Sequence, residues 1–471
     1  MYLNTLRNIA YLYFKNKIHG VLYPYSNIKG DIKLKIIVVG ASHGGQAAIE
    51  EIQTQKNNQV KWFDQGNIAD SLRLEAAEAE QKFAELAAKH IQVFSHYQVI
   101  HVETKSQRLT VRNLETGQDQ VEAYDKLIVA TGAAPAKLPI PGIDLSGILM
   151  IRDAHSLMQF RHEAENDAIK HVVVVGAGYI GIGAVSLFAQ AGKQVTVIDS
   201  GERILGSYLD DEFTNVIDQA LMQKDVRIQT HERVTEFVGN HNQITAVKTD
   251  RATYPADLVI MSIGAKPNTS WLAGAVDLDD TGLVKTNQFQ QTSDPNIFAV
   301  GDITKIWYTP GQVAMNISLA SNARRQGYLA ARNLTMPMHA FSGTQGTSAW
   351  NVLDYQFGTT GLNQQTAARL NLAIKSSYLE ENMGTDLTSR QREKVQFKLI
   401  YDPESFKILG AQIMAKSNVS DFINTISLAI QMKMTIVQLA DADFFFHPSL
   451  GNESNIMLAT ALQAVETEHL D

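Results

Sequence analysis

The sequence predicts an α/β fold with two parallel-sheet domains, and three observations indicate it. A strand, a glycine-rich turn, a helix and a second strand follow one another twice along the chain. The first glycines of the two turns, Gly40 and Gly176, are about 136 residues apart, far enough to place the two units in different domains. Strands that alternate with helices in this way form parallel sheets. The chain has 471 residues, sized for roughly three domains of about 150 residues, so a further domain is expected.

The composition excludes several classes of protein. With 45% apolar residues, 19% charged residues and a net charge of −8, the chain is typical of a globular protein and unlike a collagen, a coiled coil or a disordered chain. No run approaches the ~18 apolar residues of a membrane helix, so we expect no membrane span. The acidic balance offers no attraction for nucleic acid. We therefore expect a cytoplasmic protein.

The sequence contains no cysteine. This excludes disulfides, thiolate metal ligands, cysteine nucleophiles and every mechanism that passes through a sulfenic acid. No metal site is predicted. The missing thiol is the strongest functional constraint that the composition supplies.

Residues 1–33 precede the first predicted domain. They are rich in tyrosine and lysine, and their apolar run, residues 9–14, is too short for the core of a signal peptide. We expect a loosely ordered extension or the product of a misplaced start codon. The alternative is an amphipathic surface anchor.

The first repeat begins with a strand at residues 34–39 and continues into Gly40-Ala41-Ser42-His43-Gly44-Gly45. A helix and a second strand follow, and that strand ends at Asp64. Such glycines allow a tight turn and a close approach to a pyrophosphate at a helix N-terminus, while the acid accepts a hydrogen bond from a ribose hydroxyl. Ser42 replaces the middle glycine of the usual G-x-G-x-x-G pattern. A glycine-rich turn without a ligand is therefore the alternative.

The second repeat has the complete pattern. The strand at residues 171–175 leads into Gly176-Ala177-Gly178-Tyr179-Ile180-Gly181, and the next strand ends at Asp199. An acid at this position binds a free ribose 2′-hydroxyl and repels the 2′-phosphate of NADP, so the site is predicted to prefer NADH. Two dinucleotide sites on one chain suggest hydride transfer from a nicotinamide to a flavin.

Two later segments indicate which domain holds the flavin. One strand ends in the turn Ala130-Thr131-Gly132-Ala133, and another, after residue 292, ends at Asp302. Both are compatible with a return of the chain to the first domain. In flavoproteins with two such folds, the second segment places a carboxylate on the ribityl hydroxyls, so Asp302 is assigned to FAD. The alternative for Asp302 is a solvated loop acid.

These motifs resemble the NADH oxidase, NADH peroxidase and coenzyme A-disulfide reductase family of FAD-dependent pyridine nucleotide oxidoreductases. The resemblance extends from Leu34 to about Glu466 and rests on the stretches GASHGG, VGAGYIGIGA, VTVIDSGERILGSYLDDEF, MSIGAKPNTSWL, TSDPNIFAVGDIT, NISLASNARRQG, GTQGTSAWNVLDYQFGTTGLN and LADADFFFHPSLGNESN. It implies an α/β protein with two Rossmann-like dinucleotide-binding domains, one for FAD and one inserted for NAD, plus a C-terminal α/β dimerisation domain. Homodimers or dimers of dimers are expected. The implied ranges are 34–148 and 270–338 for the FAD domain, 149–269 for the NAD domain and 339–471 for the C-terminal domain.

The resemblance also implies site residues. It places FAD on Gly40, Ala41, Ser42, His43, Gly44, Asp64, Ala130, Thr131, Gly132, Ala133, Arg152, Asp302, Ser318, Leu319 and Ala320. It places NADH on Ile180, Asp199, Tyr208 and Gly264. His43 matches the family's active-site histidine, and His447 lies in a segment that reaches toward the partner subunit's flavin, so both are predicted to be catalytic. The alternatives are that His43 only packs or caps a helix and that His447 only caps or lies in an interface.

The chain departs from the family in two places. The redox cysteine of the family follows the acid of the second strand, but residues 64–75 here form a shorter segment that contains no cysteine and continues into an Ala/Glu-rich helix. Ser71 is the nearest hydroxyl, and a serine cannot form a sulfenic acid. A glutamate of the family is Gly183 here.

These departures shape the expected function. Reduction of H2O2 to water and of disulfides in this family uses the cysteine, whereas transfer of a hydride from NADH to FAD does not. We therefore expect an enzyme that oxidises NADH and passes two electrons to O2, with H2O2 as the product. Dyes, free flavins or quinones are other candidate acceptors. The alternative is a non-catalytic FAD- and NADH-binding redox sensor or partner subunit of an active paralogue.

Overall fold

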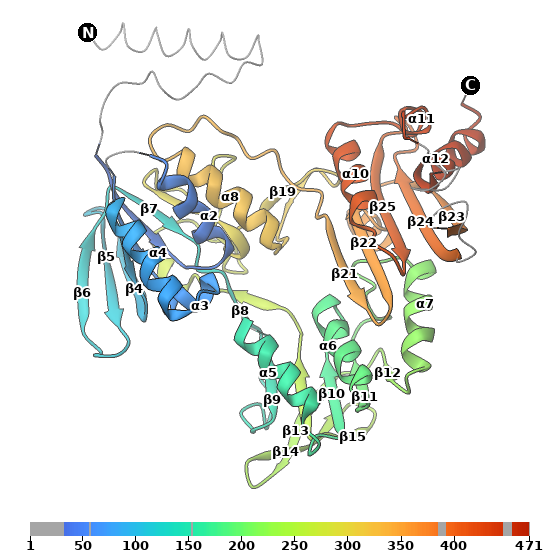
Figure 1. The fold of residues 1–471 in the computed structure, drawn as a ribbon, viewed down its shortest axis with the longest axis horizontal. Coiled ribbons are helices and arrows are strands. Elements are labelled where there is room, and N and C mark those ends of the chain that lie inside the picture. The colour runs from blue at the N-terminus through green and yellow to red at the C-terminus, as the bar shows by residue number, and fades with distance from the viewer. Residues whose placement is uncertain (1–32, 56–57, 152–153, 385–391, 446–454, 471) are drawn as a thin grey trace, which may run out of the picture.

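The computed structural model describes residues 33–55, 58–151, 154–384, 392–445 and 455–470, and these form three regions (Figure 1). Most of residues 1–33, together with Arg152 and His447, lie outside the described residues. The first region lies at the upper left of Figure 1, the second below it and the C-terminal region at the right.

The first region contains a five-stranded parallel sheet in the order β18-β7-β1-β2-β3. The strands are β1 (Lys35–Val39), β2 (Gln59–Phe63), β3 (Ile91–Phe94), β7 (Lys126–Val129) and β18 (Ile297–Ala299). The chain thus leaves this sheet after β7 and returns to add β18, with the whole second region between them.

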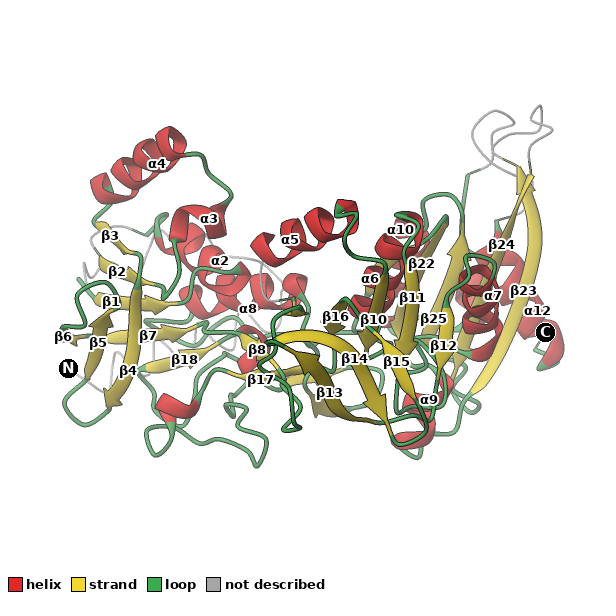
Figure 2. Cartoon of the chain, turned by 90° about the horizontal axis from the view of Figure 1, so that it is seen from below, coloured by secondary structure: helices red, strands yellow, loops and turns green. Residues whose placement is uncertain are grey.

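Alternate residues of β1 explain why this sheet is covered on both faces. Ile36 and Val38 pack with α2 (His43–Ile52) and α8 (Ala320–Arg332). Ile37 and Val39 pack on the opposite face with the antiparallel sheet of β4 (Tyr97–Glu103), β5 (Arg108–Asn113) and β6 (Asp119–Ala123). A strand buried on both faces needs a continuous apolar run, and KIIVV supplies one. Figure 2 shows the helices on one side of this sheet and the antiparallel strands on the other.

The second region repeats this design. Its parallel sheet has the order β12-β11-β10-β16-β9. The strands are β9 (Ile148–Met150), β10 (His171–Val175), β11 (Gln194–Ile198), β12 (Arg227–Gln229) and β16 (Leu258–Met261). One face carries α5 (Ala154–Glu165), α6 (Tyr179–Gln190) and α7 (Asp211–Met222), and the other carries β13 (Val234–Asn240), β14 (Gln243–Thr249) and β15 (Thr253–Pro255). Two short strands, β8 (Ala133–Pro135) and β17 (Ala265–Pro267), pair where the chain passes between the two regions.

The C-terminal region has a five-stranded antiparallel sheet in the order β21-β22-β25-β24-β23. Its strands are β21 (Ser348–Val352), β22 (Tyr355–Gly361), β23 (Lys375–Gly384), β24 (Arg392–Tyr401) and β25 (Ile408–Ala415). Its helices are α9 (Gln364–Arg369), α10 (Ser420–Gln431), α11 (Ile436–Ala440) and α12 (Ile456–Thr467). The predicted α/β class and the two parallel-sheet domains are confirmed.

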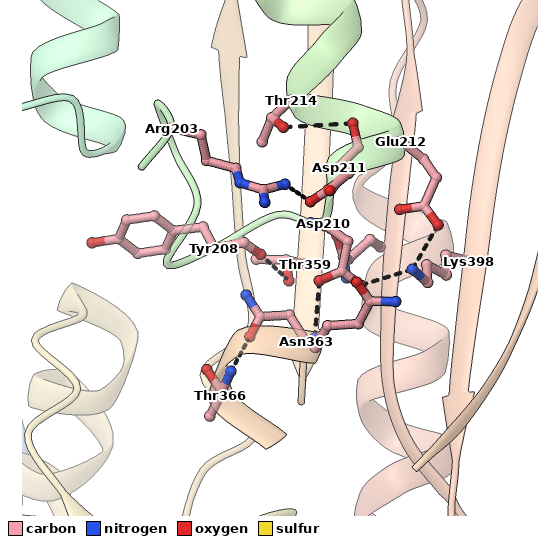
Figure 3. Close-up of polar contacts among 12 residues, drawn as sticks. Arg203, Tyr208, Asp210, Asp211, Glu212, Thr214, Thr359, Asn363, Thr366 and Lys398 are labelled. Atoms are coloured by element: carbon pink, nitrogen blue, oxygen red, sulfur yellow. Dashed lines mark hydrogen bonds and ion pairs between the residues drawn. The ribbon is translucent and has the colours of Figure 1, made fainter. Parts of the chain in front are cut away.

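The second and C-terminal regions share a core and a buried polar network. Phe357 and Met414 of the C-terminal sheet belong to the same apolar cluster as helices α6 and α7. Beside it, the Lys398 ammonium lies 3.0 Å from a carboxylate oxygen of Asp210 and 2.8 Å from one of Glu212, and the Lys398 side chain is 1% exposed (Figure 3). Gln412 both accepts from the Asp210 N–H and donates to its carboxylate. These contacts fix the second region against the C-terminal sheet.

Among the described residues, no helix has the length and apolar character to cross a membrane. The same residues contain no group of histidine and carboxylate side chains arranged to hold a metal ion.

Candidate functional site

The first glycine turn has a geometry that requires glycine at two positions. Gly40 has a φ of +105°, and a Cβ there would lie 2.2 Å from the Ala130 carbonyl oxygen. A Cβ on Gly45 would lie 1.9 Å from the Gly40 carbonyl oxygen. Ser42, in contrast, is the N-cap of α2 with a φ of −84°, which any residue can adopt. The serine in place of the usual middle glycine therefore leaves the turn intact.

Asp64 holds this turn from the end of β2. One of its carboxylate oxygens accepts a hydrogen bond of 2.7 Å from the Ala41 N–H, and the other accepts one of 2.7 Å from the Gly66 N–H. The Trp62 indole donates to the Gly40 carbonyl oxygen at 2.9 Å. A carboxylate thus lies beside the N-terminus of α2, as a ribose-binding acid would.

Asp302 and His43 come together at the carboxyl edge of the same sheet. Asp302 follows β18, within the short 3-10 helix Gly301–Ile303, and His43 is the exposed first residue of α2. Burial raises the pKa of Asp302, while the nearby His43 and the Ser318 hydroxyl offset part of that rise. Asp302 is therefore partly desolvated, and its assignment to FAD stays a prediction.

Among the other described residues predicted for FAD, residues 130–133 follow β7, and residues 318–320 lead into α8. The Thr131 hydroxyl donates to the Asn268 carbonyl oxygen at 2.8 Å, and the Asn268 amide donates back to the Thr131 carbonyl oxygen at 3.0 Å. Gly132 has a φ of +60°. Leu319 and Ala320 are the N-cap and the first residue of α8.

The second glycine turn reproduces the first. Gly176 has a φ of +100°, and a Cβ there would lie 2.2 Å from the Ser262 carbonyl oxygen. Asp199 accepts hydrogen bonds of 2.6 Å from the Ala177 N–H and from the Gly201 N–H. The carboxylate again lies at a helix N-terminus, here that of α6.

A cavity of about 370 Å³ opens beside this turn. Two of the residues predicted for NADH, Asp199 and Tyr208, line this cavity. Ile180 and Gly264 are not part of its lining; Ile180 is 37% exposed on α6, and Gly264 has a φ of +102°. The lining residues are Ala177, Gly178, Asp199, Gly201, Glu202, Arg203, Leu205, Gly206, Ser207, Tyr208, Leu209, Asp210, Asp211, Gln364 and Gln365.

Three aromatic rings pack together beside the cavity. The rings of Tyr208 and Tyr179 are 5.3 Å apart edge-to-face, and Trp350 lies 5.8 Å from Tyr208. Burial raises the pKa of Tyr208 to about 12. Burial, and in smaller part the charge of Asp302, also raises the pKa of Tyr179. Tyr179 thus lies between the two predicted nucleotide sites.

The C-terminal region contributes to the cavity through residues that sequence reasoning missed. Gln364 and Gln365, at the start of α9, line it, and the Gln364 N–H donates to Asp210 at 2.9 Å. Figure 3 shows Asp210 beside the start of α9, where the Asn363 side chain accepts a hydrogen bond from the Thr366 N–H. No local sequence pattern indicates these contacts, because the partners lie more than a hundred residues apart.

The segment that lacks the redox cysteine folds as two helices. The short helix α3 (Ile68–Leu72) is capped by the Asn67 side chain and ends at Arg73, which has a φ of +58°. Helix α4 (Ala76–Ala88) then begins with a capping box. The Ala/Glu-rich helix expected after residue 75 is α4, and the segment before it contains the additional short helix α3. Ser71 is exposed, and its carbonyl oxygen accepts a hydrogen bond from the Gln46 side chain.

Gly183, the second departure, is half-buried in the middle of α6. A Cβ at this position would meet no atom within 4 Å. Helix packing therefore does not explain a glycine here.

Family comparisons agree with this geometry. Residues 34–327 match the model of the pyridine nucleotide-disulphide oxidoreductases, and residues 347–457 match the model of their dimerisation domain. The chain belongs to this family. Its C-terminal region is accordingly the family's dimerisation domain.

Individual relatives of the family cover nearly the whole chain. An NADH oxidase of Enterococcus faecalis is 36% identical over 448 residues, which are 92% of this chain and 100% of that protein. An NADH oxidase of Lactococcus lactis is 30% identical over 92% of this chain and 100% of its own length. The structure of a water-forming NADH oxidase from Lactobacillus brevis, bound to NADH, is 30% identical with a TM-score of 0.85, over 93% of this chain and 99% of that one.

Proposed function

We propose that this protein is an FAD-dependent NADH oxidase that passes a hydride from NADH to FAD and then two electrons to O2, with H2O2 as the product. The observation that carries the proposal is that both dinucleotide turns keep their geometry in a chain that has no cysteine. The intact turns retain what hydride transfer needs. The missing thiol removes the family's route from peroxide to water.

The residues around the first turn fit FAD. Gly40 and Gly45 hold the turn tightly against its neighbours, so that the free N–H groups at the start of α2 are available to a pyrophosphate. Asp64 and the partly desolvated Asp302 are placed to accept hydrogen bonds from sugar hydroxyls. When bound there, the flavin would accept a hydride and return electron pairs to O2.

The cavity beside the second turn fits the adenosine part of NADH. Its volume of about 370 Å³ is within the range of small-molecule sites. Asp199 has the position of the acid that binds a ribose 2′-hydroxyl, and Tyr208 also lines the cavity. The nicotinamide would then extend past Tyr179 toward the flavin.

H2O2 is the proposed product because this sequence has no thiol that could be oxidised to a sulfenic acid. The Ser71 hydroxyl cannot form a sulfenic acid. The relative from Lactobacillus brevis is named water-forming, so the product is the point at which we propose that this chain differs from it.

His43 is the proposed proton carrier. Its exposed ring begins α2 and is near enough to influence Asp302. A proton held there could be supplied to the reduced oxygen. A role of His447, which would act across a homodimer, stays a prediction. Exposed apolar side chains on α12 and on or just after α10 fit such a dimer, since Leu428, Met432 and Leu462 are 59%, 70% and 48% exposed.

Anaerobic reduction tests the hydride step. The purified yellow holoprotein should bleach on addition of NADH and recover its colour in air, and NADPH should be much slower. A flavin that stays oxidised would favour the second candidate, a non-catalytic FAD- and NADH-binding sensor or partner subunit, which the loss of both the cysteine and the glutamate at Gly183 supports.

A further inference from the structure

The cavity beside the second turn has an unusual charge pattern. Four carboxylates line it, those of Asp199, Glu202, Asp210 and Asp211, together with a single arginine, Arg203, among the described residues. Lys398 and Gln412 already bind the buried Asp210 from behind. Arg203 is thus the one cation of the lining that could meet an anionic ligand.

Arg203 is bound by an acid of the same lining. Its guanidinium forms an ion pair with Asp211, the first residue of α7 (Figure 3). Arg203 also lies near Asp218, farther along the same helix, where its charge offsets part of the burial that raises the pKa of that carboxyl. A Cβ on Gly206 would lie 2.7 Å from Cγ of Arg203, so Gly206 leaves room for this side chain. The ion pair therefore holds the arginine at the start of α7.

We propose that the ion pair with Asp211 prevents Arg203 from binding the nucleotide. This pair, together with Asp199, then disfavours the binding of nucleotides that carry a 2′-phosphate. This inference rests on the proposed function, because it needs an adenosine ribose beside Asp199. A 2′-phosphate brings about −1.5 to −2 charges and needs a cation for compensation. The arginine that could provide it already donates to Asp211.

The proposal predicts a latent phosphate site. When Asp211 no longer holds it, the Arg203 guanidinium can rotate into the cavity and bind a phosphate in bidentate fashion. The Arg203 side chain is 28% exposed and the Asp211 side chain 57% exposed, so we expect the protein to fold when either residue is substituted.

The test compares binding of 2′,5′-ADP and 5′-ADP to the FAD-loaded protein by isothermal titration calorimetry, which needs no turnover. Asp211→Asn should tighten 2′,5′-ADP about tenfold and change 5′-ADP less than about twofold. Arg203→Gln combined with Asp211→Asn should lose that gain. Glu202→Gln, the matched control, removes one negative charge from the same lining without releasing Arg203. It should tighten the binding of 2′,5′-ADP about threefold or less.

The outcomes distinguish a failure of the proposed role of the Arg203–Asp211 pair from a failure of the proposed NADH site. If Asp211→Asn left the ratio of the affinities for 2′,5′-ADP and 5′-ADP unchanged, the proposal would be overturned. A tighter binding of 2′,5′-ADP that persisted in the double variant, or that Glu202→Gln also produced, would overturn it as well. A wild-type protein that binds neither ADP compound would instead contradict the proposed NADH site itself.

Discussion

Asp64 and Asp199 occupy equivalent positions in their regions, and each accepts two backbone hydrogen bonds at a glycine turn. Sequence spacing alone was sufficient to find them, because an acid about 20 residues after the first glycine is part of a local strand–turn–helix–strand unit. The pairing of Arg203 with Asp211 was not predictable in this way. It depends on how a loop folds over the first turn of a helix, and no periodic pattern records that.

Asp302 provides a prediction at the level of a single residue. The pKa of Asp302 is raised in the folded apoprotein, so ionisation of this carboxyl destabilises the fold. The contribution of Asp302 to stability therefore falls as pH rises from the ordinary pKa of Asp toward the raised value. Asp302→Asn should therefore raise the melting temperature of the apoprotein near pH 7. The same change should weaken FAD binding about tenfold, because it removes a charge-assisted hydrogen bond.

Thermal unfolding of the apoprotein and FAD titration by fluorescence measure these two effects separately. Stability and affinity that both fell together would indicate a structural role for Asp302. An unchanged FAD affinity would remove Asp302 from the cofactor site.

At the scale of elements, the strands and helices next to the glycine turns were well predicted, and the added antiparallel sheets were not. Strand β4 pairs with β5 through a register shift between Val99 and His101, and β13 pairs with β14 through two such shifts. Each bulge moves the following side chains to the other face, so the apolar–polar alternation that marks a strand is broken. The apolar residues of these strands are present in the sequence, but their alternation shifts by one residue at each bulge.

Helix α6 contains two glycines with opposite requirements, which gives a matched pair of variants. Gly183→Ala should stabilise the apoprotein by about 0.5–1 kcal/mol, because the helix gains a better former and the Cβ meets nothing within 4 Å. Gly181→Ala should destabilise it, since a Cβ there would lie 1.9 Å from the Gly176 carbonyl oxygen. Urea unfolding of the two variants measures both signs. Loss of stability in Gly183→Ala would mean that this position faces a close contact.

The whole molecule depends on contacts between residues far apart in sequence. Lys398 and Asp210 are 1% and 2% exposed, and they connect the second region with the C-terminal sheet. The family resemblance implied a C-terminal dimerisation domain, and the match to that domain confirms it. It did not imply that this domain supplies Gln364 and Gln365 to the cavity beside Asp199, because such a contact exists only once the second and C-terminal regions have folded and docked.

Lys398→Met should cost about 3–5 kcal/mol of stability, because it leaves the Asp210 carboxylate buried without its cation. Combining it with Asp210→Asn should recover much of this loss, since the remaining amide is neutral and Gln412 can still bond it. Denaturant unfolding of the single and double variants measures the coupling. Equal stability of Lys398→Met and the wild-type protein would show that the ion pair is not needed for docking.

The central claim is that two intact dinucleotide sites without a thiol make an oxidase that stops at peroxide. The most direct test is the amount of H2O2 formed per NADH consumed in air by FAD-loaded, catalase-free protein, followed by a peroxidase-coupled assay. We predict close to one H2O2 per NADH, and no acceleration of anaerobic NADH oxidation by added H2O2. His43→Ala should lower the rate and leave this ratio unchanged. NADH oxidation that consumes O2 and yields water without detectable peroxide would contradict the account.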